Sequence, residues 1–313
     1  MREDDLLSRL EGIFAAVDPS VLVGPGPDDC AHLEADGRRL AVSTDAFAEG
    51  SHFPPGTPAG AVAYKALAAS VSDLAASACR ARWALVCLSL RRGMEASWAE
   101  DFARGLAGAA GEFGVSVVGG DTISSPAGLF VAVTALGEPL PGGPILRGGA
   151  RPGDILVVTG ALGGSSLGRH LCPCPRLREI RTLMQFCRES GDGVFPSAGM
   201  DVSDGLSLDL HRLCRESGVG AEIDAASIPL SPDALRAAGE SGQSPLRHAL
   251  ADGEDFELLL ALPPGLWKKF NRRLAGPAAF TAIGRITEGK GLILREADGR
   301  TRPLPPQGYQ HQW

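Results

Sequence analysis

The stretch AGAVAYKALAASVSDLAASACRARWALVCLSL, residues 59–90, decides the fold. Its first part is rich in alanine and carries apolar residues at intervals of three and four, which predicts a helix over residues 59–77. The apolar run at 83–90 predicts a strand shortly after it. Asp73 lies inside the helix among Ala, Val and Leu, so we expect its carboxylate to cap a neighbouring group or to face a cation.

Similar patterns flank this stretch on both sides. Strands are predicted at 38–47, 115–120 and 128–137. A helix is predicted at 96–114, and Gly114 stands where a C-terminal cap would lie. These elements form a strand-rich α/β unit that ends near residue 140.

A segment dense in Gly and Pro, residues 137–154, interrupts every periodic pattern and predicts a linker. Beyond it, the patterns predict a strand at 154–160, a helix after 161–171, and strands at 220–228, 256–262, 280–286 and 291–297. The sequence therefore predicts two α/β domains, residues 1–140 and 154–313, with a linker at 141–153.

Length and composition fit two packed units. A chain of 313 residues with 44% hydrophobic content exceeds the roughly 250–300 residues at which a single core stops growing. The formal net charge of −7 argues against nucleic acid or an anionic membrane as a partner, since both need clustered Lys and Arg. No apolar run reaches the roughly 20 residues of a membrane span, and the first residues are acidic, so we expect a cytoplasmic protein.

The 7 cysteines predict reduced thiols, because their number is odd and none forms a CxxC pair. Cys172 and Cys174 are close enough in sequence to suggest a metal site. Zinc normally takes four ligands, however, and no second Cys/His pair at ligand spacing accompanies them. We assign these two cysteines no role.

Acidic residues occur where predicted strands end in Gly- or Ser-rich turns. They lie in four motifs: Asp28-Asp29, Ser43-Thr44-Asp45, Gly119-Gly120-Asp121 and Asp201-Val202-Ser203-Asp204-Gly205. A carboxylate beside glycines, which let backbone N–H groups approach a ligand, suits Mg²⁺ held between protein and phosphate oxygens. Because Mg²⁺ takes only one or two carboxylates per ion, this many carboxylates indicate several ions and a nucleotide site. The alternative for any single motif is that Asp and Gly simply favour turns.

Two stretches match familiar motifs only in part. Residues 284–291 nearly match a phosphate-binding P-loop, but Gly291 stands where a Ser or Thr should bind Mg²⁺ and a strand follows, which predicts a hairpin turn. Ser166 fits a G-x-S-x-G pattern, yet four residues separate the strand's closing glycine from the first serine, so a nucleophilic serine is disfavoured. The same glycines do not have dinucleotide-fold spacing.

In their order and spacing, the motifs resemble the thiamine-monophosphate kinase family, within the wider group that is similar to aminoimidazole ribonucleotide synthetase. The resemblance covers nearly the whole chain. It is carried by Asp28-Asp29-Cys30-Ala31, Ser43-Thr44-Asp45, Gly50-Ser51-His52-Phe53, Tyr64-Lys65-Ala66-Leu67, Ser72-Asp73-Leu74-Ala75, Gly119-Gly120-Asp121-Thr122, Arg147, Asp201-Val202-Ser203-Asp204-Gly205-Leu206, Gly253-Glu254-Asp255-Phe256-Glu257-Leu258 and Gly308-Tyr309.

The resemblance implies a two-domain, aminoimidazole ribonucleotide synthetase-like fold of the α/β (α+β) class, with mixed sheets flanked by helices. It also implies a homodimer whose N-terminal halves pair their sheets, with ATP in a cleft between the domains. The implied magnesium ligands are Asp29, Ser43, Thr44, Asp45, Asp73, Asp121, Asp201 and Asp204. The implied nucleotide contacts are Gly120, Asp121, Arg147 and Ser203, and the implied thiamine-phosphate contacts are His52, Glu254 and Tyr309. The implied catalytic residues are Asp45, Asp121 and Asp204.

The implied activity is phosphorylation of thiamine monophosphate by ATP with Mg²⁺, through in-line attack of a substrate phosphate oxygen on the γ-phosphorus. That oxygen is already anionic near neutral pH, so no strong general base is needed. Arg147 would hold phosphate oxygens with its planar donor fork. Glu254 would accept a hydrogen bond from the thiamine base or offset the charge of its cationic ring.

Other members of the fold fit less well. A selenophosphate synthetase would carry a reactive Cys before Gly24, and a hydrogenase-maturation dehydratase would end in a cysteine where this chain has Trp313. Aminoimidazole ribonucleotide synthetase is the closest enzymatic alternative, but Ser72-Asp73-Leu74 and the segment at 253–256 fit the kinase better. A non-catalytic nucleotide sensor would have lost several acidic ligands, and none is lost.

Overall fold

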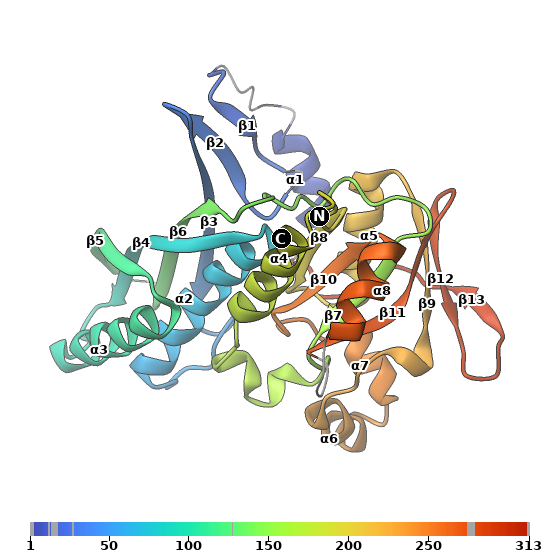
Figure 1. Cartoon of the computed structure of the whole chain (residues 1–313). Helices are drawn as coiled ribbons and strands as arrows, with labels where there is room; N and C mark the ends of the chain where they lie inside the picture. Colours follow the sequence, from blue (N-terminus) through green and yellow to red (C-terminus); the bar gives the residue numbers. More distant parts are fainter. Residues whose placement is uncertain are drawn as a thin grey trace.

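The first half of the chain forms a six-stranded sheet with helices on one face (Figure 1). The structure is a computed structural model, which describes residues 3–11, 13, 18–26, 28–126, 128–273 and 279–311. The strand order is β1-β2-β3-β6-β4-β5, and neighbours are antiparallel except for β4 and β5. The elements are α1 (Glu3–Glu11), β1 (Val21–Val23), β2 (Ala31–Ala35), β3 (Arg38–Ala48), α2 (Ala59–Ala76), β4 (Cys79–Arg91), α3 (Ala96–Phe113), β5 (Ser116–Ser125) and β6 (Phe130–Pro139).

The second half forms a seven-stranded mixed sheet in the order β13-β12-β9-β11-β7-β10-β8. Its strands are β7 (Ile155–Thr159), β8 (Ala198–Val202), β9 (Gly220–Asp224), β10 (Glu257–Leu262), β11 (Phe280–Thr287), β12 (Gly291–Arg295) and β13 (Thr301–Pro303). Its helices are η1 (Ser165–Leu167), η2 (Arg169–Leu171), α4 (Leu177–Ser190), α5 (Leu206–Ser217), η3 (Ala225–Ser227), α6 (Pro232–Ser241), α7 (Pro245–Ala251) and α8 (Pro264–Arg273).

Strand β10 shows how this sheet is buried on both faces. Leu258 and Leu260 belong to one apolar core, together with α4 and α8, whereas Leu259 belongs to a second core with α5 and α7. Successive side chains of a strand point to opposite faces, so a strand buried on both sides is continuously apolar. All six residues of β10 are buried.

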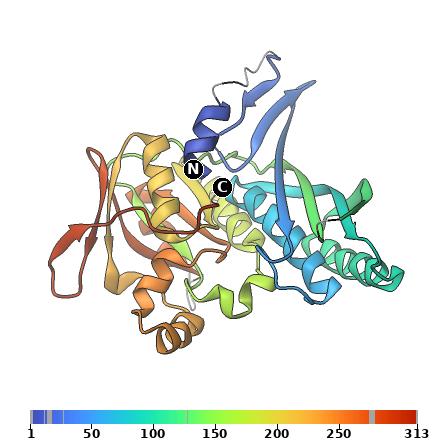
Figure 2. The same cartoon turned by 180° about the vertical axis from the view of Figure 1, so that it is seen from behind.

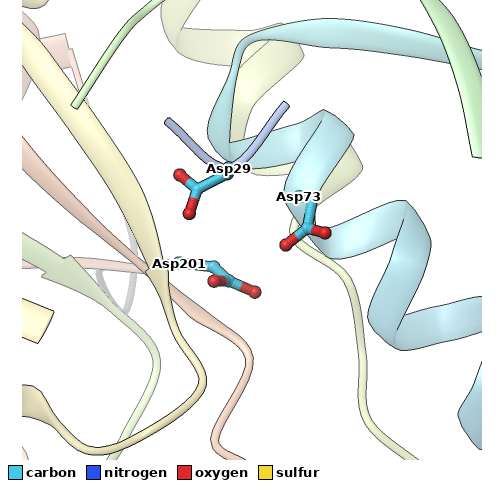
Figure 3. Close-up of side chains that lie close together, drawn as sticks. All are labelled: Asp29, Asp73 and Asp201. Carbon is cyan, nitrogen blue, oxygen red and sulfur yellow. The ribbon is translucent and has the colours of Figure 1, made fainter. Parts of the chain in front are cut away.

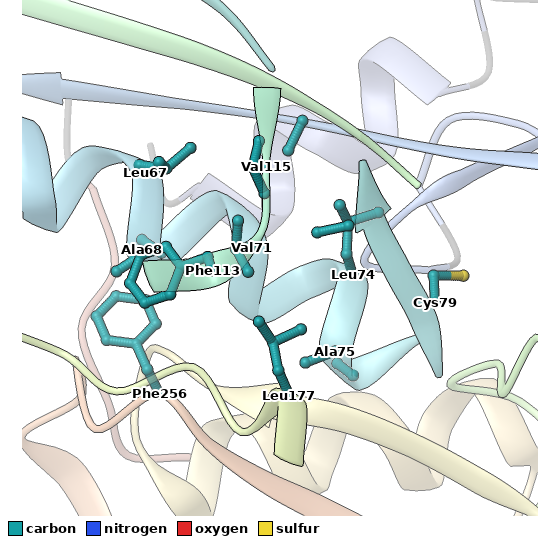
Figure 4. Close-up of a cluster of buried hydrophobic side chains, with 14 of the residues drawn as sticks. Leu67, Ala68, Val71, Leu74, Ala75, Cys79, Phe113, Val115, Leu177 and Phe256 are labelled. Carbon is teal, nitrogen blue, oxygen red and sulfur yellow. The ribbon is translucent and has the colours of Figure 1, made fainter. Parts of the chain in front are cut away.

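Helix α2 lies between the two sheets and belongs to both halves of the molecule (Figures 1 and 2). It packs on β3, β4 and β6 of the first sheet, on β8 and β10 of the second sheet, and on helix α4. Figure 4 shows Leu67, Val71 and Leu74 of this helix in one apolar cluster with Leu177 and Phe256 of the second half. A helix that is apolar on nearly every side is buried on every side, which explains why this one has so little polar surface.

The predicted elements are all present, with two differences in detail, and the predicted fold class is confirmed. The predicted strand at 220–228 stops at Asp224, because the Asp224 carboxylate accepts a hydrogen bond from the N–H of Ala226 and starts a 3-10 turn. The hairpin predicted at 284–291 is wrong. Strands β11 and β12 do not pair, since β9 lies between them and pairs with both.

The segment between the two sheets is irregular, as the sequence predicts. Residues 140–154 contain no helix or strand, and Arg147 lies in this segment. Within the described part of the chain, none of the helices has the length and apolar character needed to cross a bilayer.

Helices α2 and α3 touch at Gly60 and Gly105, and this contact gives a test of the fold. A Cβ added at Gly105 would lie 2.4 Å from the Cα of Gly60, whereas a Cβ at Gly108 would meet nothing within 4 Å. Overpacking forces backbone shifts that typically cost about 1–3 kcal/mol of stability. We expect Gly105→Ala to lower the free energy of unfolding, measured by urea denaturation. Gly108→Ala is the matched control and should leave it unchanged or raise it by up to about 1 kcal/mol. Equal effects of the two substitutions would contradict the close helix contact.

Candidate active site

Three carboxylates from distant parts of the chain converge where the two halves meet. Asp29 lies in the turn before β2, Asp73 in α2 and Asp201 in β8. One oxygen from each of the three lies within 4.8 Å of the others. Figure 3 shows the three side chains around one common space. We call these residues the acidic cluster.

Hydrogen bonds from neighbouring side chains fix the cluster. The Ser43 hydroxyl donates to Asp73, and the Ser72 hydroxyl donates to Asp201 Oδ2 at 2.6 Å. Ser72 precedes Asp73 in α2, so one helical turn contributes both the Asp73 carboxylate and the hydroxyl that orients the Asp201 carboxylate. Ser43 belongs to β3, whose alternation turns Ser43 and Asp45 toward α2.

Arg147 is the cation of this region. Its guanidinium Nη2 donates to Asp29 Oδ1 at 2.5 Å, and its backbone N–H donates to Asp28 Oδ2 at 3.0 Å. The irregular segment between the two sheets is therefore held against the turn that carries Asp29. Arg147 thus already contacts a carboxylate that the resemblance identifies as a metal ligand.

Burial and mutual repulsion raise the pKa values of these carboxyl groups. The pKa values of Asp73 and Asp201 are raised well above the ordinary value, first by burial and then by neighbouring carboxylates. Burial also raises the pKa of Asp45 to about 6, and burial together with Asp29 raises the pKa of Asp28 to about 7. Several negative groups are thus held together out of water, which is unfavourable unless cations join them.

The residues present fit magnesium. Among the described residues, Asp29 Oδ2 and Asp45 Oδ2 are buried and have no hydrogen-bond partner. A buried carboxylate oxygen without a partner is costly, and hard cations such as Mg²⁺ take oxygen ligands of this kind. The acidic cluster and Asp45 therefore have the donor atoms that such ions need.

Asp45 also lines a polar cavity of about 340 Å³. Its walls come from both halves of the chain, and they include Thr44, Asp45, Phe47, His52, Ser203, Asp204, Asp252, Glu254, Phe256 and Tyr309. Pockets of this size commonly bind small molecules. The predicted substrate contacts His52, Glu254 and Tyr309 are thus brought together around the cavity, which Ser203 and Asp204 also line.

His52 is oriented by the backbone that precedes it. Its Nδ1 accepts a hydrogen bond from the N–H of Ala48 at 3.1 Å, so the neutral ring carries its proton on Nε2. Burial is the main cause that lowers the pKa of His52, with Glu254 acting in the opposite direction. The neutral form, with Nε2 as a donor, is therefore favoured near neutral pH.

The loop that carries Glu254 has a strained backbone. Glu254 and Phe256 have positive φ angles of 53° and 51°, a region that non-glycine residues rarely adopt. The N–H of Glu254 donates to Ser203 O at 2.6 Å, and the Asp255 carboxylate accepts from the N–H of Gly163 at 3.0 Å and from Arg169 at 2.8 Å. The contact with Ser203 holds the strained loop against the end of β8, and the contacts of Asp255 hold it against the segment at 163–169.

Asp204 is paired with a residue of the following helix. Arg212 in α5 donates to Asp204 and, at 3.1 Å, to the buried Asp209. The Asp204 carbonyl accepts from the N–H of Tyr309 at 2.9 Å, which attaches the C-terminal segment to the same wall. The Tyr309 ring is 46% exposed and lies 5.0 Å from the His311 ring.

Not every predicted residue joins the site. Thr44 lines the cavity, but its hydroxyl contacts Thr134 Oγ1 at 3.0 Å on the face of the first sheet opposite to α2, so it is turned away from the acidic cluster. Gly120 and Asp121 lie on the edge strand β5, where they line a different hollow with Val86 and Phe102. A Cβ at Gly120 would approach the carbonyl oxygen of Val86 to 1.8 Å, so this glycine has a packing role of its own.

The sequence interpretation also missed some residues that contact the site. Lys65 and Asp255 lie in motifs that carry the resemblance, but the resemblance implies no role for them or for Asp209. A usable signal was present for Lys65, since it is a charged residue in the same apolar helix as Asp73. Asp209 similarly lies in the apolar helical pattern of 206–213.

The raised pKa values predict how the metal-free protein responds to pH. Asp45, Asp28 and Asp209 have folded pKa values of about 6, 7 and 8, whereas in the unfolded chain each titrates near 4. The folded state therefore holds protons that the unfolded state has already lost, and stability must fall as the pH rises from about 4 to about 8. In EDTA, we expect the thermal midpoint to fall from pH 5 to pH 8.

Magnesium and one variant serve as controls for this prediction. Mg²⁺ competes with these protons, so added Mg²⁺ should raise the midpoint most at pH 8 and flatten the series. Asp45→Asn in EDTA should show a shallower fall than the native protein. A midpoint that rises with pH in EDTA would contradict the assigned directions.

Comparison with known proteins identifies the family of the chain. The family described as AIR synthase related protein, N-terminal domain, matches residues 27–138, and the corresponding C-terminal domain matches residues 151–296. The thiamine-monophosphate kinase of Rhodopirellula baltica is 36% identical over 99% of this chain and 97% of its own length. The Escherichia coli enzyme of the same name is 33% identical over 91% of this chain and 90% of its own length.

A solved structure extends the likeness to three dimensions. AaThiL complexed with AMPPCP and TMP superposes with a TM-score of 0.81 at 30% identity, over 99% of this chain and 95% of that protein. The sequence and structural similarities therefore cover both sheets, the acidic cluster and the cavity. The chain belongs to the thiamine-monophosphate kinase family, within the AIR synthase related proteins.

Proposed function

We propose that this chain is itself a thiamine-monophosphate kinase, which transfers the γ-phosphoryl group of ATP to thiamine monophosphate and makes thiamine diphosphate, the last step in the biosynthesis of that cofactor. The observation that carries the proposal is the acidic cluster together with the polar cavity that Asp45 lines. Relatives along the whole chain bear this name, and one solved relative holds AMPPCP and TMP. The donor set of this chain suits two phosphorylated substrates.

Several Mg²⁺ ions are part of the proposal. The acidic cluster and Asp45 would hold them, with Ser43 and Asp204 nearby. When bound, Mg²⁺ offsets the negative charge of the phosphates and bridges their oxygens to the protein. The raised pKa values of Asp73 and Asp201 fit this role, because their environment favours any cation, proton or metal.

The protein's own groups would position the substrates. Phosphoryl transfer requires little covalent chemistry from the protein, and the acceptor oxygen of a phosphate monoester is already anionic near neutral pH. Arg147 would present its planar donors to phosphate oxygens, and Ser203 would contact the nucleotide. His52 would donate from Nε2 to the phosphate of thiamine monophosphate, while Tyr309 would offer its exposed ring to the thiamine rings.

A homodimer would give Gly120 and Asp121 a place in catalysis. In one chain they lie on β5, apart from the acidic cluster. The face of the first sheet opposite α2 exposes Leu85, Ile123 and Phe130, which are 41%, 50% and 39% exposed. Asp121 aligns with Cys87 on that same face, and Thr44 lies on it too. Pairing of this face with a second copy would bury the apolar residues and would move each Asp121 toward the site of the other chain.

The remaining expectations are also proposals. We divide the chain into domains at 1–140 and 154–313 with a linker at 141–153, in line with the lack of regular structure at 140–154. We place the protein in the cytoplasm and expect no nucleic-acid partner, because the net charge is −7.

The activity itself is tested with thiamine monophosphate, ATP and Mg²⁺, followed by chromatography of thiamine diphosphate. The native protein should form the product from the monophosphate and none from free thiamine. Asp45→Asn removes a buried carboxylate that would hold Mg²⁺, so its kcat should fall by at least about 100-fold. The same change relieves repulsion, so its thermal midpoint in EDTA should not fall.

A surface variant controls for the loss of charge. Asp192→Asn removes an exposed carboxylate that pairs with Lys269 and should keep native activity. Native protein that is folded and binds ATP but forms no thiamine diphosphate would contradict the proposed function.

The dimer is tested by a charge on the exposed face. Ile123→Asp would bury a carboxylate in the proposed interface, so its mass by light scattering should fall from twice 32.4 kDa to 32.4 kDa. Its activity should fall with the mass if Asp121 acts in the partner's site. Leu235→Asp, at a residue of α6 that is 58% exposed, is the matched control and should leave the dimer intact. A native protein that is monomeric at the concentration of the assay and fully active would rule this arrangement out.

A further inference from the structure

Lys65 is a charged side chain buried where the two halves of the chain meet. It lies in α2 and is only 1% exposed. Its Nζ donates to the carbonyl oxygen of His52 at 2.5 Å and to the carboxylate of Glu254. Lysine is almost never fully buried unless it is paired, so these two contacts account for its position. Both of its partners line the cavity.

The two contacts join segments that are far apart in sequence. His52 belongs to the turn after β3, and Glu254 belongs to the strained loop before β10. The ammonium group lies between these two segments, and its one side-chain partner among the described residues is Glu254, since His52 contributes only a backbone carbonyl. Glu254 has a positive φ angle of 53°, and such a backbone conformation persists only where surrounding contacts hold it, of which the ion pair with Lys65 is one.

The pair also decides the electrostatic character of Glu254. Its side chain is 32% exposed, and Lys65 contacts Oε1. A salt bridge with a buried ammonium group offsets the charge of the carboxylate but leaves it able to accept further hydrogen bonds. Glu254 therefore suits a neutral N–H donor better than an unpaired positive charge. In thiamine monophosphate, the amino group of the pyrimidine is such a donor, and the thiazolium ring is the positive charge.

We propose that Lys65 is a positioning residue for thiamine monophosphate, which fixes Glu254 as an oriented, charge-compensated hydrogen-bond acceptor for the aminopyrimidine. The inference rests on the proposed function and deepens it. Lys65 acts through Glu254 and does not touch the substrate. Loss of Lys65 therefore weakens recognition of thiamine monophosphate while leaving the ATP side of the site as it is.

A double-mutant cycle tests this dependence. Lys65→Met, Glu254→Gln and the double variant are compared by calorimetric titration of thiamine monophosphate with Mg²⁺ and AMPPCP present. Each single variant should bind about 10- to 100-fold more weakly, the range expected for a charge-assisted hydrogen bond. The double variant should bind no more weakly than Glu254→Gln alone, because Lys65 acts through that residue. The KM for ATP should stay within about twofold of the native value.

A substrate analogue separates positioning from a purely structural role. In oxythiamine monophosphate, oxygen replaces the amino group of the pyrimidine, so the donor is lost while the thiazolium charge remains. The native protein should bind this analogue at least about 10-fold more weakly than thiamine monophosphate. Lys65→Met should lose most of that discrimination. Lys269→Met, which removes an exposed lysine of α8, is the matched control and should keep it.

The outcomes distinguish this inference from the proposed function. Additive losses in the double variant, or native discrimination in Lys65→Met, would overturn the role of Lys65 while the kinase activity stands. Native protein that does not bind thiamine monophosphate would overturn both. If Lys65→Met does not fold, as judged by its thermal midpoint, Lys65→Gln replaces it in the cycle, because its amide still donates hydrogen bonds but carries no charge.

Discussion

The acidic cluster imposes the constraint on which the rest of the structure depends. Asp29, Asp73 and Asp201 are held together away from bulk water, where like charges repel strongly. Such a group persists only if protons, basic side chains or metal ions offset its charge. The three carboxylates come from a turn, a helix and a strand, so the arrangement exists only when both halves of the chain are packed around α2.

The central position of α2 explains both its sequence and its function. Its apolar residues pack on two sheets at once, which requires small and aliphatic side chains on nearly every side. Asp73 and Lys65 are the charged residues of this helix, and both are directed to the site. A charged residue in such a helix is unfavourable unless a specific partner meets it. The helix is therefore rigid where precise placement of charge matters.

Local patterns in the sequence predicted most of the fold and the membership of the site. Apolar periodicity reports the burial of each segment, which is why residues 59–77, 83–90 and 256–262 were correctly assigned as helix, strand and strand. Strand pairing is not a local property. The hairpin expected at 284–291 was wrong because β9, about sixty residues earlier, inserts between the two strands. Periodicity shows that a segment is a strand but does not identify its neighbour.

The same limit applies to the site residues. The acidic motifs were expected where strands end, but Asp45, Asp121 and Asp201 lie within β3, β5 and β8, because these strands extend further than their apolar runs. The structure nevertheless brings most of the acidic motifs to one place. Asp121 is the exception, since its strand is at the sheet edge and its side chain faces away from α2. No property of the segment around residue 121 could show this, because the strand order of the sheet decides it. In the proposed dimer, Asp121 would face the site of the second chain.

Three basic side chains neutralise carboxylates around the cavity, and their burial separates them into two kinds. Arg147 pairs with Asp29 and Arg212 with Asp204, and each arginine side chain is 12% exposed. These carboxylates would hold Mg²⁺ in the proposed function, so the ions would replace the arginines as their partners and leave the guanidinium groups to face phosphate oxygens. Lys65 is 1% exposed, and its partner Glu254 is not a proposed metal ligand. In the proposed function, this pairing would persist whether or not ions and phosphates are bound. The proposed site would thus combine a part in which Mg²⁺ can replace basic side chains with a fixed part that recognises the organic portion of the substrate.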